Sequence, residues 1–248
     1  VVTHSSGNHG AALALAARTR GIACHVVVPE GAVASKLAAI QAYGATLHRC
    51  APTIAAREAR CADVQRDTGA TLVHPYTDAL VIAGQGTATL ELLDGKARFD
   101  ALVVPVGGGG LASGTALAMA QLAPGCRLYV AEPSGAAETA ASLQRGARVT
   151  EFVPDTICDG LRGTLGEPNF ELLRTHAVEA LLVDDADTVA AMRLLWERTK
   201  QVVEPSSATA FAAILRHRER FAGRRVGIVL SGGNVDLDAL PALFAAGR

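Results

Sequence analysis

The sequence predicts an α/β protein with two lobes, each an open, twisted and mostly parallel sheet with helices on both faces. Short β-branched runs alternate with alanine-rich runs of helical spacing along the 248 residues, as in successive strand–helix–strand units. Half of the residues are apolar, which is enough for a sizeable core. Glycine-containing loops directly follow several of the apolar runs, as expected where a strand leads into a helix.

The elements of residues 1–77 follow from apolar patterning and from glycines that end helices. The run CHVVVP is continuous, β-branched and ended by proline, which is typical of a buried strand. Gly44 and Gly69 come directly after helical spacing, where glycine commonly ends a helix. The sequence predicts a strand-like opening at Val1, helices at Ala11–Arg18, Ser35–Tyr43 and Thr53–Thr68, and strands at Cys24–Pro29 and Thr71–His74.

Residues 78–248 continue the alternation. The runs ALVVPV (Ala101–Val106) and LYVA (Leu128–Ala131) are predicted strands on either side of a helix at Leu111–Leu122, and RVGIVL (Arg225–Leu230) is a late strand. Parallel strands of one sheet carry their carboxyl ends at the same edge. Open α/β sheets bind ligands at that edge, so the loops that follow the strands are the places to look for chemistry.

The overall composition excludes several function classes. The net charge is only -1, which does not indicate binding to nucleic acid or to an anionic membrane surface. No run is long and apolar enough for a membrane span, and no basic-then-apolar leader opens the chain. The five cysteines lack C-x-x-C spacing and the seven histidines lack H-x-x-x-H spacing, so a zinc or redox centre is not indicated. We expect a cytoplasmic protein with reduced thiols that binds neither nucleic acid nor membrane.

Four consecutive glycines, residues 107–110, lie between a predicted strand and a predicted helix. Without Cβ atoms the backbone can approach a phosphate, and the helix that follows offers free N–H groups and its positive dipole end. No Lys-Ser or Lys-Thr pair follows, so this is not the loop of a nucleoside triphosphatase. Two alternatives are a turn that needs glycine only for packing and a dinucleotide site. Gly107, Gly109 and Ala112 match G-x-G-x-x-A, and Glu132 ends the next strand, where a ribose-binding acid would lie.

Two further loops combine hydroxyl and amide side chains with glycine at strand ends. Thr3–Gly10 precedes an alanine-rich helix, and the hydroxyls of Ser5 and Ser6 can donate hydrogen bonds to a carboxylate together with backbone N–H groups. Ordinary helix capping is the alternative. The run Ser231–Asn234 presents a hydroxyl beside two glycines, which suits contact with a flat ligand and is equally typical of a turn.

Together these loops resemble those of the fold-type II pyridoxal 5'-phosphate enzymes, whose fold is like that of the tryptophan synthase β subunit. Within that family the chain is similar to the branch of serine racemases and serine/threonine dehydratases. The matching segments cover nearly the whole chain in the family's order. They are VVTHSSGNHG (Val1–Gly10), KLAAIQAYGA (Lys36–Ala45), VIAGQGT (Val81–Thr87), ALVVPVGGGGL (Ala101–Leu111), AEPS (Ala131–Ser134) and SGGNVDL (Ser231–Leu237).

The resemblance implies a pyridoxal phosphate site built from three loops. Asn8 would hydrogen-bond the 3-oxygen of the pyridine ring, and Ser231 would meet the ring nitrogen. A neutral hydroxyl there leaves that nitrogen unprotonated and moderates the electron sink, which suits elimination. The remaining cofactor-binding residues, with the glycines around the phosphate, would be Gly107, Gly108, Gly109, Gly110 and Leu111.

The same resemblance assigns substrate binding to the loop after the first strand. Ser5, Ser6, Asn8 and His9 would grip the substrate carboxylate. Ser6 lies where the family has the acid and base on the ring face opposite the Schiff-base lysine. Residues 1–77 would form a smaller lobe that moves over the substrate and excludes water, and residues 78–248 would form the larger cofactor lobe.

A divalent cation site is also implied by the resemblance. Glu132, the carbonyl of Ala136 and Glu138 match the family's ligands, and oxygen ligands suit Mg²⁺ or Ca²⁺. The family usually has Asp at the last position, where this chain has the longer Glu138. A solvated acidic helix start is the alternative. Glu204 would lie near the cofactor, with a capped helix start as its alternative.

The sequence departs from the family at the catalytic lysine. The family carries this lysine in a Ser-Phe-Lys-type segment before the SSGNHG loop, whereas this sequence opens at that loop with Val1. The lysines present are Lys36, Lys96 and Lys200, and none lies in such a segment. We therefore expect that the sequence lacks the Schiff-base lysine and the N-terminal part of the larger lobe.

The expected activity is that of a dehydratase which converts L-serine or L-threonine into a 2-oxo acid and ammonia. Racemisation of serine at the same site is the first alternative, with Ser6 delivering a proton from the opposite face, and 3-hydroxyaspartate is a related substrate. The stretch Asp159–Phe170 lies where substrate preference would be set. Alternatives of other classes are a nicotinamide-dependent dehydrogenase, from the G-x-G-x-x-A match, and an inactive fragment without the lysine. A homodimer is expected by resemblance alone.

Overall fold

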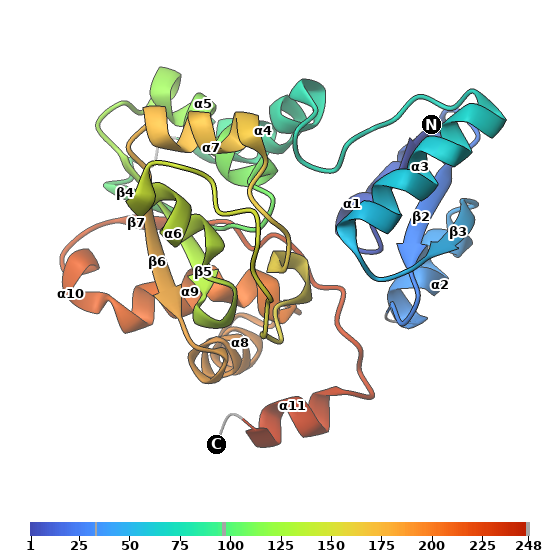
Figure 1. Cartoon of the computed structure of the whole chain (residues 1–248). Coiled ribbons are helices and arrows are strands. Elements are labelled where there is room, and N and C mark those ends of the chain that lie inside the picture. The colour runs from blue at the N-terminus through green and yellow to red at the C-terminus, as the bar shows by residue number, and fades with distance from the viewer. Residues whose placement is uncertain (33, 96–97, 247–248) are drawn as a thin grey trace. The chain divides into compact units, whose positions relative to one another are not determined.

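The computed structural model describes residues 1–32, 34–95 and 98–246. The chain divides into two compact units, Val1–Asp78 and Ala79–Arg248, and each has its own sheet (Figure 1). Every strand pair in the described ranges is parallel. The predicted α/β class with mostly parallel sheets is therefore confirmed.

The first unit is built on a sheet of order β1-β2-β3 with helices on both faces. Alternate residues of a strand point to opposite faces, and the central strand shows this directly. Val26 and Val28 pack with Ala14 and Ile40 of the first two helices, whereas Val27 packs with Val64 of the third. The elements are β1 (Val2–Thr3), α1 (Asn8–Thr19), β2 (His25–Pro29), α2 (Ala34–Ala42), β3 (Thr46–Cys50) and α3 (Ile54–Thr68).

The second unit holds a sheet of order β6-β5-β4-β7. Its strands are β4 (Ala101–Pro105), β5 (Arg127–Pro133), β6 (Glu179–Val183) and β7 (Val226–Ile228). Its longer helices are α4 (Ala79–Asp94), α5 (Gly110–Leu122), α6 (Glu138–Arg145), α7 (Glu167–Thr175), α8 (Asp185–Thr199) and α9 (Pro205–Arg216). Shorter helical pieces are η1 (Ser134–Ala136), η2 (Asp159–Leu161), α10 (Arg218–Phe221) and α11 (Leu240–Ala246).

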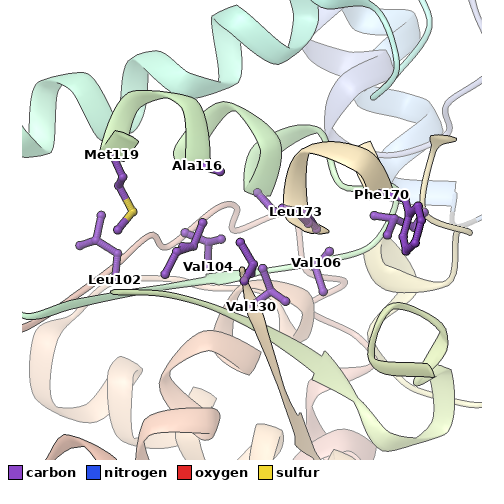
Figure 2. Close-up of a cluster of buried hydrophobic side chains, with 12 residues drawn as sticks. Leu102, Val104, Val106, Ala116, Met119, Val130, Phe170 and Leu173 are labelled. Carbon is purple, nitrogen blue, oxygen red and sulfur yellow. The ribbon is translucent and has the colours of Figure 1, made fainter. Parts of the chain in front are cut away.

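The core of the second unit lies on both faces of β4. Leu102 and Val104 point toward Met119 of α5 and Leu173 of α7, as Figure 2 shows. The residues between them, such as Val103, pack on the other side in a cluster that includes residues of α8 and α9. Because β4 is buried along its whole length, its carboxyl end is held rigidly, and so is the start of the loop that follows it.

Most predicted elements are present, with ends shifted by a few residues. One prediction was wrong: residues 71–74 form no strand, only a bridge between Leu72 and Val2. The reason is that β1 has two residues, so its ladder with this segment ends after the bonds of Val2 with Thr71 and Val73. Each of the five cysteines is a free thiol. No helix in the described part of the chain is long and apolar enough to cross a membrane.

Candidate active site

The loop of residues 107–110, here called the glycine cradle, joins β4 to α5. Gly109 is the N-cap of α5 and has a φ of 92°, in the left-handed region that favours glycine. A Cβ atom at Gly109 would lie 2.5 Å from Cδ1 of Leu165 and 2.8 Å from Cβ of Asn169. None of the described side chains caps this helix start. The first N–H groups of α5 therefore meet the requirements of an anion site.

A segment of residues 156–166, here called the strap, packs directly on the glycine cradle. The backbone N–H of Gly166 donates to the carbonyl of Gly108 at 3.1 Å. A Cβ atom at Gly107 would lie 2.9 Å from the carbonyl oxygen of Gly160. The stretch 159–170, expected to influence substrate preference, thus packs against the loop predicted to bind the phosphate.

Side chains from four different segments of the second unit hold the strap. Asp185 accepts from the hydroxyl of Thr156 (2.5 Å) and from the N–H of Ile157 (2.9 Å), and Ser206 accepts from the N–H of Gly160 (3.0 Å). Glu138 accepts from the N–H of Leu165, and Nε of Arg148 donates to the Leu165 carbonyl, both at 2.9 Å. Sequence reasoning missed these anchors, because nothing in the pattern around Asp185, Ser206 or Arg148 indicates a partner that far along the chain.

Ser231 lies at the same sheet edge as the glycine cradle. It follows β7, which pairs in parallel with β4, and the cradle follows β4. The carbonyl of Gly232 accepts from the N–H of Glu204 at 3.1 Å, so the Ser231 loop is tied to the start of α9. Glu204 is buried and is the N-cap residue of α9, where its backbone carbonyl accepts from the N–H groups of Ser207 and Ala208 at 3.0 Å.

The loop of Ser5, Ser6 and Gly7 lies in the first unit and leads into α1, whose first residue is Asn8. Gly7 is the N-cap, and within the described ranges no side chain caps the helix. A Cβ atom at Gly10 would lie 2.0 Å from the carbonyl oxygen of Ser5, so the loop folds tightly onto the first turn. Ser5 and Ser6 are half-buried. The uncapped helix start favours carboxylate binding over ordinary capping.

His9 belongs to a cluster of histidines beside this loop. The rings of His4 and His74 meet edge to face with centroids 4.9 Å apart. Burial lowers the pKa of His4 and of His9, and it lowers the pKa of His74 to about 4. The Nε2 atom of His9 is buried without a hydrogen-bond partner among the described residues. The three imidazoles are therefore neutral near pH 7 and add no positive charge to the loop.

The predicted cation ligands lie between β5 and α6. The carboxylate of Glu132 accepts from the N–H groups of Thr139 (2.7 Å) and Ala140 (2.9 Å) at the start of α6. Glu132 and Glu138 are each only 2 % exposed, so the alternative of a solvated acidic helix start is wrong. Burial raises the pKa of Glu132 to about 7 and also raises that of Glu138. Within the described ranges no three His, Cys, Asp or Glu side chains gather as a metal site.

Two of the three lysines lie in the described ranges. Lys36 is on α2, and Lys200 ends α8, where its Nζ donates to the carbonyl of Glu197. Lys96 lies outside the described residues. Of the predicted site residues, the second unit holds the glycine cradle, which the strap contacts, and Ser231 at the same sheet edge. The first unit holds Ser5, Ser6, Asn8 and His9 in the loop before α1 and in its first turn.

Comparison with known proteins decides which family these loops represent. The profile of the family described as pyridoxal-phosphate dependent enzyme matches residues 1–232. The chain belongs to this family. It is 44% identical over 241 residues to a beta-hydroxyaspartate dehydratase of Paracoccus denitrificans, covering 97% of this chain and 76% of the relative. It is 45% identical over 244 residues to a serine racemase of Dictyostelium discoideum, covering 97% and 75%.

A solved structure shows the same fold as this pyridoxal-phosphate dependent enzyme. The structure of maize serine racemase superposes with a TM-score of 0.93 at 42% identity, over 99% of this chain and 76% of that chain. The family match favours pyridoxal phosphate over the dinucleotide alternative. The residues present fit that cofactor, because the N–H groups of a glycine loop at an uncapped helix start suit its phosphate.

Proposed function

We propose that this protein is a pyridoxal-phosphate dependent dehydratase that converts a β-hydroxy amino acid, such as L-serine or L-threonine, into a 2-oxo acid and ammonia. The observation that carries the proposal is the placement of Ser231, a neutral hydroxyl, at the same sheet edge as the glycine cradle. Pyridoxal phosphate, when bound, supplies an electron sink for charge that develops at the substrate Cα. A hydroxyl at the ring nitrogen moderates that sink, which suits loss of the β-hydroxyl.

In the second unit, the N–H groups of the glycine cradle and Leu111 would bind the phosphate. These groups lie at the start of α5, and no side chain in the described part of the chain caps them. The strap would fix the cradle from behind through Gly166 and Leu165. A rigid donor set of this kind holds the cofactor's tail and fixes the orientation of its ring.

In the first unit, Ser5, Ser6, Asn8 and His9 would bind the substrate carboxylate, and Asn8 would also bind the cofactor's 3-oxygen. Hydroxyl donors and the uncapped start of α1 supply the hydrogen bonds. Neutral imidazoles keep the local charge small, so the carboxylate is held mainly by hydrogen bonds. The hydroxyl of Ser6 would hold or deliver a proton at the substrate Cα.

Serine racemisation is the second candidate function. It is favoured by the 45% identity to the Dictyostelium discoideum serine racemase and by the half-buried hydroxyl of Ser6, which suits proton delivery to Cα from a second face. Chiral analysis of serine after incubation separates the two activities, since only racemisation produces D-serine.

A divalent cation, Mg²⁺ or Ca²⁺, is proposed at Glu132, the carbonyl of Ala136 and Glu138. Two buried carboxylates of raised pKa are costly to ionise, and a cation would offset that cost. That the protein is a cytoplasmic homodimer stays a prediction.

Incubation of the full-length protein with L-serine, L-threonine and 3-hydroxyaspartate tests the proposed function. Each molecule of amino acid consumed should give one 2-oxo acid and one ammonia, with water lost and then regained in hydrolysis. The absence of 2-oxo acid from all three substrates would sink the proposal. Formation from 3-hydroxyaspartate alone would keep the reaction and change the substrate.

A further inference from the structure

We propose that Arg148 is a positioning residue for the glycine cradle, acting through the backbone of the strap. The inference rests on the proposed assignment of the cradle to the cofactor phosphate. Arg148 lies in the loop after α6 and is remote in sequence from the cradle. Its Nε donates to the carbonyl of Leu165 at 2.9 Å, across 17 residues of chain.

Both backbone groups of Leu165 are held by side chains of opposite charge. Its N–H donates to the carboxylate of Glu138 at 2.9 Å, while its carbonyl accepts from Arg148. Leu165 itself is fully buried, and its side chain fills the space next to Gly109. Hydrogen bonds to charged groups are stronger than those between neutral groups. The backbone direction at Leu165 is therefore set by Glu138 and Arg148 together.

The orientation set at Leu165 is passed to Gly108 by the planarity of the peptide bond. The described chain has no cis peptide, so the carbonyl of Leu165 and the N–H of Gly166 point in opposite directions from one plane. The carbonyl points to Arg148 on one side. The N–H donates to the carbonyl of Gly108 on the other side at 3.1 Å.

The same geometry applies once more in the cradle itself. The carbonyl of Gly108 points to the strap, so the N–H of Gly109, in the same peptide plane, points away from the strap. That N–H is one of the donors at the start of α5. A chain of two peptide planes thus links the guanidinium of Arg148 to a donor of the phosphate site, and hydrogen bonds in such a chain polarise one another.

Loss of Arg148 would release the Leu165 carbonyl without removing the packing of the strap. An unpaired buried carbonyl is costly and turns toward any available donor, such as water. Its rotation would swing the N–H of Gly166 away from Gly108. The Leu165 side chain, Ser206 and Asp185 would still hold the strap in place, so the expected effect is on donor direction rather than on folding.

Cofactor binding separates this role from a merely structural one. We compare binding of pyridoxal phosphate and of pyridoxal, which lacks the phosphate, to the full-length apoprotein. The Arg148→Met variant should bind pyridoxal phosphate about five- to tenfold more weakly, the worth of about one ordinary hydrogen bond, because the effect reaches the phosphate only indirectly. Binding of pyridoxal should change less than twofold. Arg148→Gln keeps an N–H donor and should recover part of the lost affinity for pyridoxal phosphate. The same comparison is made with this variant if the methionine variant fails to fold.

Arg145→Met is the matched control, because Arg145 is an exposed arginine at the end of α6, three residues before Arg148. It removes the same charge and should leave both affinities unchanged. If Arg148→Met weakens the binding of both ligands equally, the effect is generally structural and the proposal is overturned. Unchanged binding of pyridoxal phosphate by this variant would also overturn it. A wild-type protein that binds both ligands equally would overturn the cradle assignment itself, whether or not the dehydratase activity is found.

Discussion

The backbone N–H of Gly166 donates to the carbonyl of Gly108 at 3.1 Å, and this bond ties the strap to the glycine cradle. Around it, the side chain of Leu165 occupies the space in which a Cβ at Gly109 would have to lie. The cradle is therefore shaped by the strap as much as by its own sequence.

Replacement of Gly109 by alanine should disrupt the cradle. The residue has a φ of 92° and no room for a Cβ, so the variant must strain the backbone or displace Leu165. We expect a loss of about 1–3 kcal/mol in unfolding free energy and weaker binding of pyridoxal phosphate. Gly125→Ala is the control, since a Cβ there meets nothing within 4 Å. Equal behaviour of the two variants in thermal unfolding and cofactor titration would contradict this account of the loop.

Ser6→Ala should abolish racemisation of serine while elimination continues. The reason is that a proton delivered from the second face of Cα is needed for inversion but not for loss of the β-hydroxyl. Chiral chromatography of serine and an assay of 2-oxo acid on the same samples give both rates. If racemisation survives in the variant while elimination falls, the role assigned to Ser6 is wrong.

The histidine cluster should make stability depend on pH. Burial lowers the pKa of His74 to about 4, below the ordinary value of about 6.5. The unfolded state then binds more protons than the native state, so stability is full above pH 6.5 and is lost as pH falls toward 4. His74→Asn keeps an acceptor for the N–H groups of Tyr76 and Thr77 and cannot titrate.

We expect the midpoint of urea unfolding to depend less on pH in His74→Asn than in the wild type between pH 4 and 6.5. His4 and His9 titrate in the same direction, so part of the dependence should remain. If the urea midpoint changes equally with pH in the two proteins, His74 is not a buried neutral imidazole.

Glu132 should couple cation binding to stability. Burial raises its pKa to about 7, above the ordinary value of about 4.3 for glutamate. Proton binding by Glu132 therefore adds to the stability of the folded state below pH 4, and this contribution is lost as pH rises through 7. A divalent cation would relieve the cost of the ionised form. The rise in Tm on adding Ca²⁺ or Mg²⁺ should be larger at pH 8 than at pH 6.

Glu132→Gln should lose this cation-dependent rise in Tm, because the amide lacks the charge that binds the ion. Glu197→Gln, on the surface of α8, should keep it, since Glu197 is exposed and pairs only with Arg193 in the described structure. A wild-type Tm that is the same in chelator and in millimolar cation would remove the case for the site.

Local patterns predicted the elements whose signals lie within a few residues. The helix predicted at Thr53–Thr68 is α3, and Gly69 ends it in the left-handed conformation, as the sequence indicated. The glycine cradle was found for the same reason, because strand, glycines and helix are contiguous.

Features of the structure that depend on residues distant in the sequence could not be predicted. Residues 71–74 do not form the expected strand, because their partner β1 is too short to extend the ladder beyond the bridge between Val2 and Leu72. The bond from Arg148 to Leu165 spans 17 residues whose one regular element in the described structure is the three-residue η2, so the span carries no periodic pattern. Glu138 is buried against Ser142 and the strap, so the local sequence could not decide between a cation site and its alternative, a solvated acidic helix start.

The central claim is that the glycine cradle and Ser231 hold pyridoxal phosphate in a working enzyme. The most direct measurement is the absorbance spectrum of the full-length protein, as purified and after hydroxylamine is added. We expect a violet absorbance band that hydroxylamine bleaches, with loss of 2-oxo acid formation and its recovery on adding pyridoxal phosphate. A protein with no such band, and none after incubation with pyridoxal phosphate, would contradict the account.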